Sequence, residues 1–167
     1  MSTSDAFFTV VLNTVAKELS DLPDPEQATR IVFKLLLAAV LGGLLGFERE
    51  TSGKAAGLRT HMLVAMGSAM FLTIAQLLGI SAQDSSRVMQ GVIAGIGFLG
   101  AGAILKPAKE SEEDVKGLTT AAGIWFTAAI GVAVGAGEES AAILCTILAL
   151  IVLMVGPWIT KDRPPKK

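Results

Sequence analysis

The stretch IVFKLLLAAVLGGLLGF, residues 31–47, decides the class of this protein, because it holds a single charged side chain, Lys34, among 17 residues. As a helix it would be about 26 Å long, enough to cross the hydrocarbon core of a bilayer. Hydrophobic residues make up 51% of the chain and charged residues 17%, too few to enclose several such helices in a soluble surface. We therefore predict an all-α fold, a polytopic helical membrane protein with about five transmembrane helices. The four further apolar runs are 62–79, 88–105, 118–135 and 141–159.

The composition divides the chain into three segments. Residues 1–29 are predicted to form an amphipathic helix and a linker, with the helix lying on the membrane or on the bundle, since no basic region marks a signal peptide. Residues 30–159 form the transmembrane domain, and residues 160–167 form a basic tail.

Several classes of protein are excluded by charge and by residue counts. The net charge of −1 gives no field that would attract nucleic acid, and the sole cysteine, Cys145, excludes an internal disulfide. No Ser/His/Asp or Cys/His arrangement stands out, so we expect no enzymatic activity, no cofactor and no transition-metal site. We expect a run of acids to form a solvated face, with hydrated magnesium as the alternative ligand: Glu110, Glu112, Glu113 and Asp114.

The basic residues predict how the chain crosses the membrane. With five spans, residues 48–61, residues 106–117 and the tail share one side, and together they hold ten Lys and Arg residues. The other side holds Lys17, Arg30 and Arg87. This bias predicts that the amino terminus lies outside and the carboxyl terminus lies in the cytoplasm.

Glycines at helical spacing predict where helices pack closely. Three spans contain a G-x-x-x-G pair, and in the span 88–105 further glycines lie on the opposite face, which predicts a central position for that helix. The same span matches the G-x-G-x-x-G of dinucleotide sites, but it lacks the strand that such a site requires, so packing is the interpretation that we favour. The predicted packing glycines are Gly42, Gly46, Gly91, Gly95, Gly97, Gly100, Gly102, Gly131 and Gly135.

Polar residues gather at the predicted cytoplasmic helix ends. Gly57-Leu-Arg-Thr and Gly117-Leu-Thr-Thr each begin a span, and two helix amino termini could bind an anion or the carboxylates of Glu48 and Glu50. The alternative is helix capping combined with positive-inside charge. At the other side, Lys34 either snorkels to the interface or pairs with an acid such as Asp84. The candidate cluster is Glu48, Arg49, Glu50, Gly57, Arg59, Thr60, His61, Lys116, Gly117, Thr119 and Thr120.

At these residues the chain resembles the MgtC/SapB family of bacterial membrane proteins. Three stretches match the family's signatures in order: Leu41 to Glu50 continued by Lys54 to His61, then Gly91 to Gly102, then Lys116 to Gly131. Lys116 stands where the third signature leads us to expect Arg, which keeps the charge but loses bidentate geometry. The resemblance also leads us to expect a short form, without the soluble carboxy-terminal domain of longer members.

The resemblance implies a bacterial inner-membrane protein with a role in adaptation to low magnesium and, in pathogens, in virulence through survival inside host cells. It implies a regulator acting on membrane partners such as ATP synthase. One alternative is a magnesium or other ion transporter or channel subunit, with a path lined by Glu48, Arg49, His61 and Thr119. Others are a homo-oligomer with a pore and a lipid-binding protein that uses the basic loops. Polar residues within the spans are few, which favours the regulator.

Overall fold

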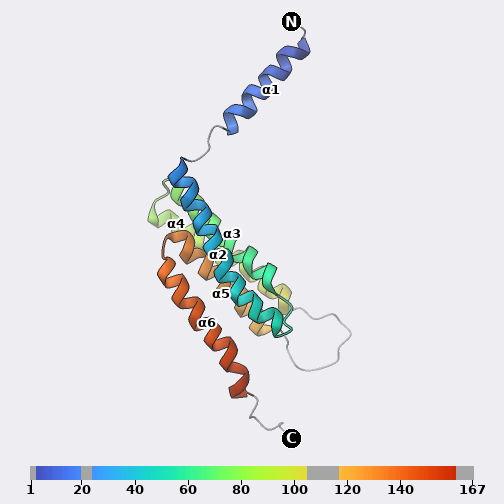
Figure 1. Ribbon diagram of the computed structural model, residues 1–167, viewed down its shortest axis with the longest axis vertical. Coiled ribbons are helices and arrows are strands. Elements are labelled where there is room, and N and C mark those ends of the chain that lie inside the picture. The colour runs from blue at the N-terminus through green and yellow to red at the C-terminus, as the bar shows by residue number, and fades with distance from the viewer. Residues whose placement is uncertain (1–2, 20–23, 105–116, 161–167) are drawn as a thin grey trace. The chain divides into compact units, whose positions relative to one another are not determined.

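The computed structural model describes residues 3–19, 24–104 and 117–160, and every regular element in those ranges is an α-helix. Five of the helices, α2 to α6, are long and apolar enough to cross a membrane. The predicted all-α polytopic membrane fold with five spans is therefore confirmed. In chain order the helices are α1 Thr3–Leu19, α2 Pro25–Thr51, α3 Leu58–Leu77, α4 Ala82–Ile104, α5 Leu118–Ala136 and α6 Glu139–Thr160 (Figure 1).

Four of the five spans, α2, α3, α4 and α6, begin before the apolar runs that predicted them, because capping residues decide where a helix begins. α2 begins at Pro25 and continues through Thr51. Proline suits the first turn, where its missing N–H has no partner to lose, and the backbone N–H of Gln27 donates to Asp24 Oδ1 at 2.8 Å. Ser81 plays the same part for α4, since its hydroxyl oxygen accepts a hydrogen bond from the Asp84 N–H at 3.1 Å.

By its contacts the chain divides into two compact units, Met1–Val32 and Phe33–Lys167. The first unit contains α1, whose described side chains are all exposed, with the rings of Phe7 and Phe8 meeting edge to face at 6.1 Å. That α1 is the predicted amphipathic segment lying on the membrane stays a prediction.

In the second unit α5 is the central helix, since it contacts α3, α4 and α6. Glycines set how closely the helices approach. A methyl group added at Gly135 of α5 would lie 2.5 Å from the Ala69 carbonyl oxygen of α3, and one added at Gly131 would collide with the carbonyl oxygen of Ala65. α3 meets α2 in the same way, because a methyl group at Gly42 would lie 2.6 Å from the His61 carbonyl oxygen. Two of the predicted glycine pairs therefore hold α2, α3 and α5 together.

The predicted central position of span 88–105 is wrong for this chain. That span is α4, which contacts α3 and α5, and its buried residues are Ile96 and Gly100. Of its predicted packing glycines, Gly100 faces Ala121 at ordinary van der Waals distance, 3.6 Å. A methyl group added at Gly91, Gly95, Gly97 or Gly102 would meet nothing within 4 Å. Glycine permits close approach but does not enforce it, so glycines on two opposite faces did not establish a central position.

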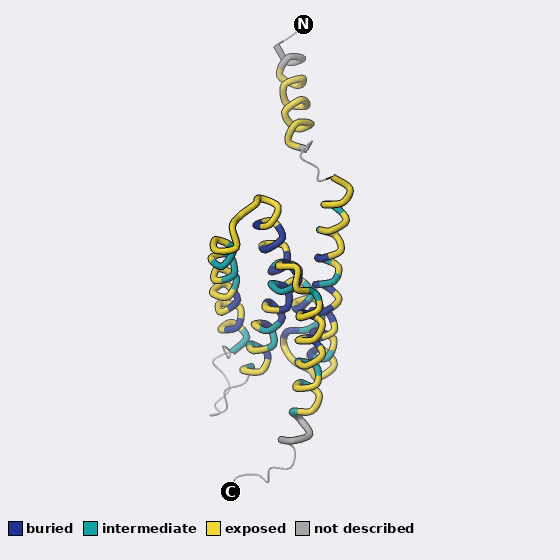
Figure 2. Tube along the Cα trace, turned by 90° about the vertical axis from the view of Figure 1, so that its left-hand side faces the viewer, coloured by how far each residue is buried: buried dark blue, intermediate teal, exposed yellow. Residues whose placement is uncertain are grey.

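The core lies where α2, α3 and α5 meet and where α6 packs against them. Figure 2 shows the buried positions on the facing sides of helices, while long outward stretches are exposed, as expected for surfaces that meet lipid. Small residues dominate this core, which lets the backbones approach closely. The main cluster is Ala38, Leu41, Leu45, Ala65, Ala69, Ile130, Val134 and Ala142.

Candidate functional site

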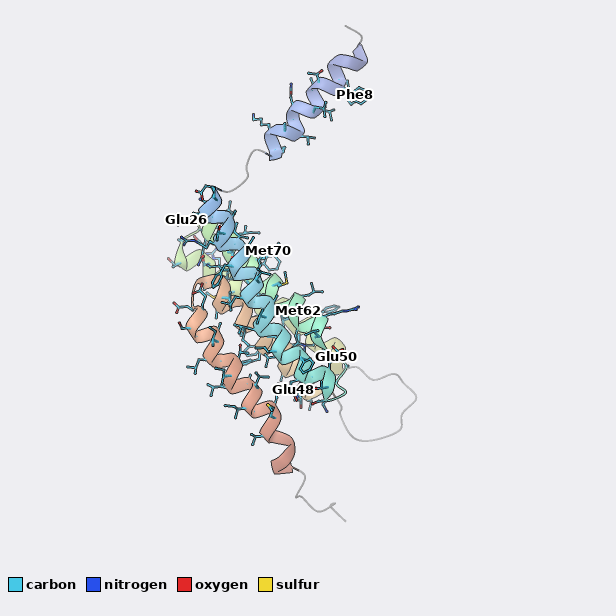
Figure 3. The ribbon with its side chains drawn as sticks, in the orientation of Figure 1. Phe8, Glu26, Glu48, Glu50, Met62 and Met70 are labelled. Atoms are coloured by element: carbon cyan, nitrogen blue, oxygen red, sulfur yellow. The ribbon has the colours of Figure 1, made fainter. Side chains whose placement is uncertain are left out.

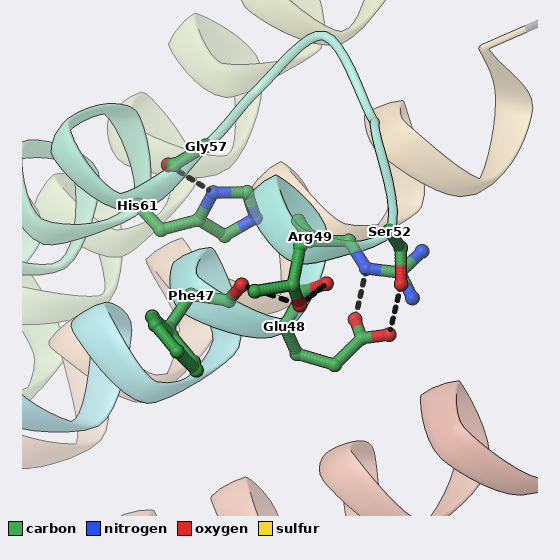
Figure 4. A network of polar contacts seen from close by, with 7 residues as sticks. Phe47, Glu48, Arg49, Ser52, Gly57 and His61 are labelled. Atoms are coloured by element: carbon green, nitrogen blue, oxygen red, sulfur yellow. Dashed lines mark hydrogen bonds and ion pairs between the residues drawn. The ribbon is translucent and has the colours of Figure 1, made fainter.

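At one end of the bundle, called here the Arg49 end, a buried ion pair closes α2. The Arg49 side chain is 4% exposed, and its Nε donates to Glu48 Oε2 (Figure 4). The second carboxylate oxygen of Glu48 accepts a hydrogen bond from the Ser52 hydroxyl at 2.9 Å. Because a buried guanidinium is costly without an anion beside it, this pairing lets Arg49 stay inside the fold.

Glu50 caps the helix that follows. Its Oε2 accepts a hydrogen bond from the backbone N–H of Leu58 at 2.8 Å, so a carboxylate from α2 occupies the amino terminus of α3. Gly57 precedes that terminus, and a methyl group added to it would lie 2.6 Å from the same carboxylate oxygen. The glycine therefore leaves room for the cap. Figure 3 shows Glu48 and Glu50 at the same end of α2.

His61 lies one turn into α3 and is fully buried. Its Nδ1 lies 3.0 Å from the Gly57 carbonyl oxygen (Figure 4). A carbonyl can only accept, so Nδ1 carries the proton, and in the neutral imidazole Nε2 is then an acceptor. Nε2 is buried and has no hydrogen-bond partner among the described residues. It faces Gly123 of α5, where an added methyl group would lie 3.5 Å away.

A cavity of about 510 Å³ opens beside the imidazole of His61. Its walls come from α2, α3, α5 and α6, and they are apolar apart from the imidazole, the Thr119 hydroxyl and the thiol of Cys145. Gly123 and Cys145 were not predicted as site residues. Gly123 lies four residues after Thr119, on the same face of α5, and that spacing was the signal available in the sequence.

The predicted cluster is only partly brought together. Five residues of the cluster lie around the α2–α3 turn: Glu48, Arg49, Glu50, Gly57 and His61. Thr119 of α5 lines the same cavity as His61. Arg59 and Thr60 are exposed, Thr120 is buried on α5, and Lys116 lies outside the described residues. Gly117 begins α5 with φ of 96°, a conformation that favours glycine, and it packs against Ala103 of α4.

The opposite end of the bundle, called here the Lys34 end, carries a second polar cluster. Lys34 is 5% exposed, and its Nζ donates to Gln76 Oε1 at 2.9 Å and to the Gly135 carbonyl oxygen at 2.8 Å. Gln76 in turn donates from Nε2 to the Ala136 carbonyl oxygen at 2.9 Å. Two side chains thus satisfy carbonyl groups that the end of α5 leaves free.

Burial corrects the expectation that Lys34 snorkels to the surface, and pairing with an acid stays a prediction. Asp84 lies in the first turn of α4, where its Oδ2 accepts a hydrogen bond from the Ser81 hydroxyl at 2.9 Å. The acids at 110–114 lie outside the described residues. Within the described part of the chain, no group of three His, Cys, Asp or Glu side chains is placed to hold a metal ion.

Fold and site together define a polytopic helical membrane protein with a buried Glu–Arg–His cluster at one end of its bundle. Residues 35–162 match the model of the MgtC family, and the chain belongs to that family. It is 43% identical over 141 residues to "Putative magnesium transporter YhiD" of Escherichia coli K12, covering 80% of this chain and 64% of YhiD.

Two further relatives have similar identity. Over 130 residues the chain is 45% identical to "Protein SrpB" of Synechococcus elongatus, covering 72% of this chain and 71% of SrpB. Over 116 residues it is 46% identical to "Protein MgtC" of Brucella abortus, covering 69% of this chain and 46% of that protein. The chain thus spans just under two thirds of YhiD and less than half of MgtC. No solved structure matches it.

Proposed function

We propose that the protein is a non-enzymatic regulator in the bacterial inner membrane that acts through membrane partners such as ATP synthase. Its role is to support adaptation to low magnesium, including survival inside a host. The observation that carries this proposal is the tight apolar layer between the Arg49 end and the Lys34 end. There α2, α3 and α5 meet at Ala38, Ala65 and Val134, all fully buried, with glycines bringing the backbones into contact. An ion path would need polar groups along the whole depth of the membrane.

The buried polar side chains of the described middle layer are hydroxyls. Thr73 donates to the Ala69 carbonyl oxygen of its own helix at 2.8 Å, and the others between the two ends are Ser68, Thr127 and Thr146. These hydroxyl groups are uncharged, so none of them could attract or repel a passing ion through its charge. A single chain packed in this way suits a scaffold that contacts other proteins better than a conduit.

The alternative function is magnesium transport, which the name of the YhiD relative favours. Purified protein in liposomes loaded with a magnesium-sensitive dye distinguishes the two. We expect the magnesium entry rate to equal that of empty liposomes, and we expect an ATP synthase subunit to copurify from membranes of cells grown in low magnesium. Saturable entry that Glu48→Ala abolishes would overturn the regulatory proposal.

A growth assay locates the regulatory surface. Arg59 is an exposed cation at the Arg49 end, so Arg59→Ala should abolish growth support in low magnesium while the protein level in the membrane stays unchanged. Arg87→Ala is the matched control, since Arg87 is an exposed cation of α4 near the other end, and it should support growth like the wild type. If Arg59→Ala fails to insert or fold, the cluster is structural rather than functional.

A further inference from the structure

Two neighbouring cavities at the Arg49 end have complementary chemistry. The first is the apolar cavity beside His61. The second, of about 650 Å³, is bordered by Arg49, Ser52 and Lys54. The two share Thr119, Val152 and Leu153 as walls, so they are adjacent. Together they make one candidate site, with an apolar interior and with Lys54 at its mouth as a cation beside the Glu48–Arg49 ion pair.

His61 Nε2 indicates which chemical group a ligand of this site would carry, since it has no hydrogen-bond partner among the described residues. A buried polar atom without a hydrogen bond is costly, and Nε2 of His61, which lines the apolar cavity, is buried. Gly123 lies beside this nitrogen, and a methyl group added there would lie 3.5 Å from it, in the space that a donor would need. The occupant that satisfies it brings a hydrogen-bond donor.

We propose that this site binds an anionic phospholipid whose headgroup carries a hydroxyl, of the phosphatidylglycerol type. Its phosphate lies at the mouth beside Lys54 and Arg49, a hydroxyl donates to His61 Nε2, and an acyl chain fills the apolar cavity. The walls are membrane-spanning helices, so the acyl chain reaches the cavity directly from the bilayer. This binding is independent of the proposed regulatory function.

Native mass spectrometry of the full-length protein in detergent tests the proposal with three lipids of equal acyl chains. Phosphatidylglycerol supplies a net negative charge and a hydroxyl, and phosphatidylmethanol supplies the net negative charge alone. Phosphatidylcholine supplies neither, because its choline cation balances the phosphate. We expect phosphatidylglycerol to bind about five-fold more tightly than phosphatidylmethanol, the value of one hydrogen bond. Phosphatidylmethanol should bind about five-fold more tightly than phosphatidylcholine, the value of one cation near the headgroup.

Two variants separate the contributions of donor and charge. Gly123→Ala covers Nε2 and should reduce phosphatidylglycerol affinity to that of phosphatidylmethanol, whereas Gly91→Ala, whose added methyl group meets nothing within 4 Å, should change neither. Lys54→Gln should weaken both anionic lipids by about five-fold and spare phosphatidylcholine. Arg87→Gln is its matched control, since both are exposed cations.

Three results would overturn the proposal. Equal affinity for the three lipids would remove the role of the headgroup. Equal losses in Gly123→Ala and Gly91→Ala, in protein whose thermal unfolding is unchanged, would remove the role of His61. Binding of glycerol phosphate as tight as that of the lipid would mean that a soluble anion, not an amphiphile, is the ligand.

Discussion

Lys34 joins α2 to α3 and to the end of α5 through hydrogen bonds to Gln76 and to the Gly135 carbonyl oxygen, and this makes it a structural residue of the bundle. In Lys34→Met the aliphatic volume remains, but the Gly135 carbonyl oxygen and Gln76 Oε1 lose their donor. We expect the free energy of unfolding, measured by SDS titration in mixed micelles, to fall by about 1–3 kcal/mol. Removing an exposed charge such as Arg30, which pairs with Glu26 at 3.0 Å on one helix, should cost less than about 0.5 kcal/mol. A Lys34→Met protein as stable as the wild type would contradict this role.

Some of the contacts of single residues could be predicted from the sequence and others could not. The signature charges predicted that Glu48, Arg49 and His61 gather at one end, because they flank a short turn. The Glu48–Arg49 pairing was not predictable, since neighbours in a helix ordinarily point apart. The partners of Lys34 lie 42 and 101 residues further along the chain, and they follow from which helices are neighbours, which hydropathy does not reveal.

At the scale of elements, backbone contact between α3 and α5 is the tightest joint of the bundle. Gly131→Ala places a methyl group against the Ala65 carbonyl oxygen, so the two helices must separate. We expect a loss of about 1–3 kcal/mol in the free energy of unfolding, as for other overpacked cores. Gly95→Ala is the matched control because its methyl group enters open space, and helix propensity alone should leave it as stable as the wild type or more so. Equal losses in the two variants would contradict this assignment of the joint.

The same comparison explains why hydropathy and glycine spacing gave the helices but not their arrangement. The spans are visible in the sequence because lipid demands apolar side chains over a fixed length. The neighbours of each span depend on the shapes of whole helix faces. α4 is rich in glycine, yet most of its glycines face open space, whereas α5 contacts α3, α4 and α6. Gly95→Leu therefore should leave folding of the single chain intact. A loss confined to assembly would show that the glycine face of α4 meets another chain.

At the scale of the whole molecule, five spans with the basic residues sorted to one side predict a defined orientation in the membrane. Two exposed turns test it as a matched pair, since Gly53 and Gly79 have φ of 67° and 66° and an added methyl group at either would meet nothing within 4 Å. Alkaline phosphatase inserted at Gly79, in the predicted outer turn between α3 and α4, should be active. The same insertion at Gly53, in the predicted cytoplasmic turn between α2 and α3, should be inactive. Alkaline phosphatase fused after Lys167 should also be inactive, whereas green fluorescent protein fused there should be fluorescent. The opposite pattern would place the Arg49 end, and with it the proposed lipid site, in the outer leaflet, and would contradict the charge bias as the determinant of orientation.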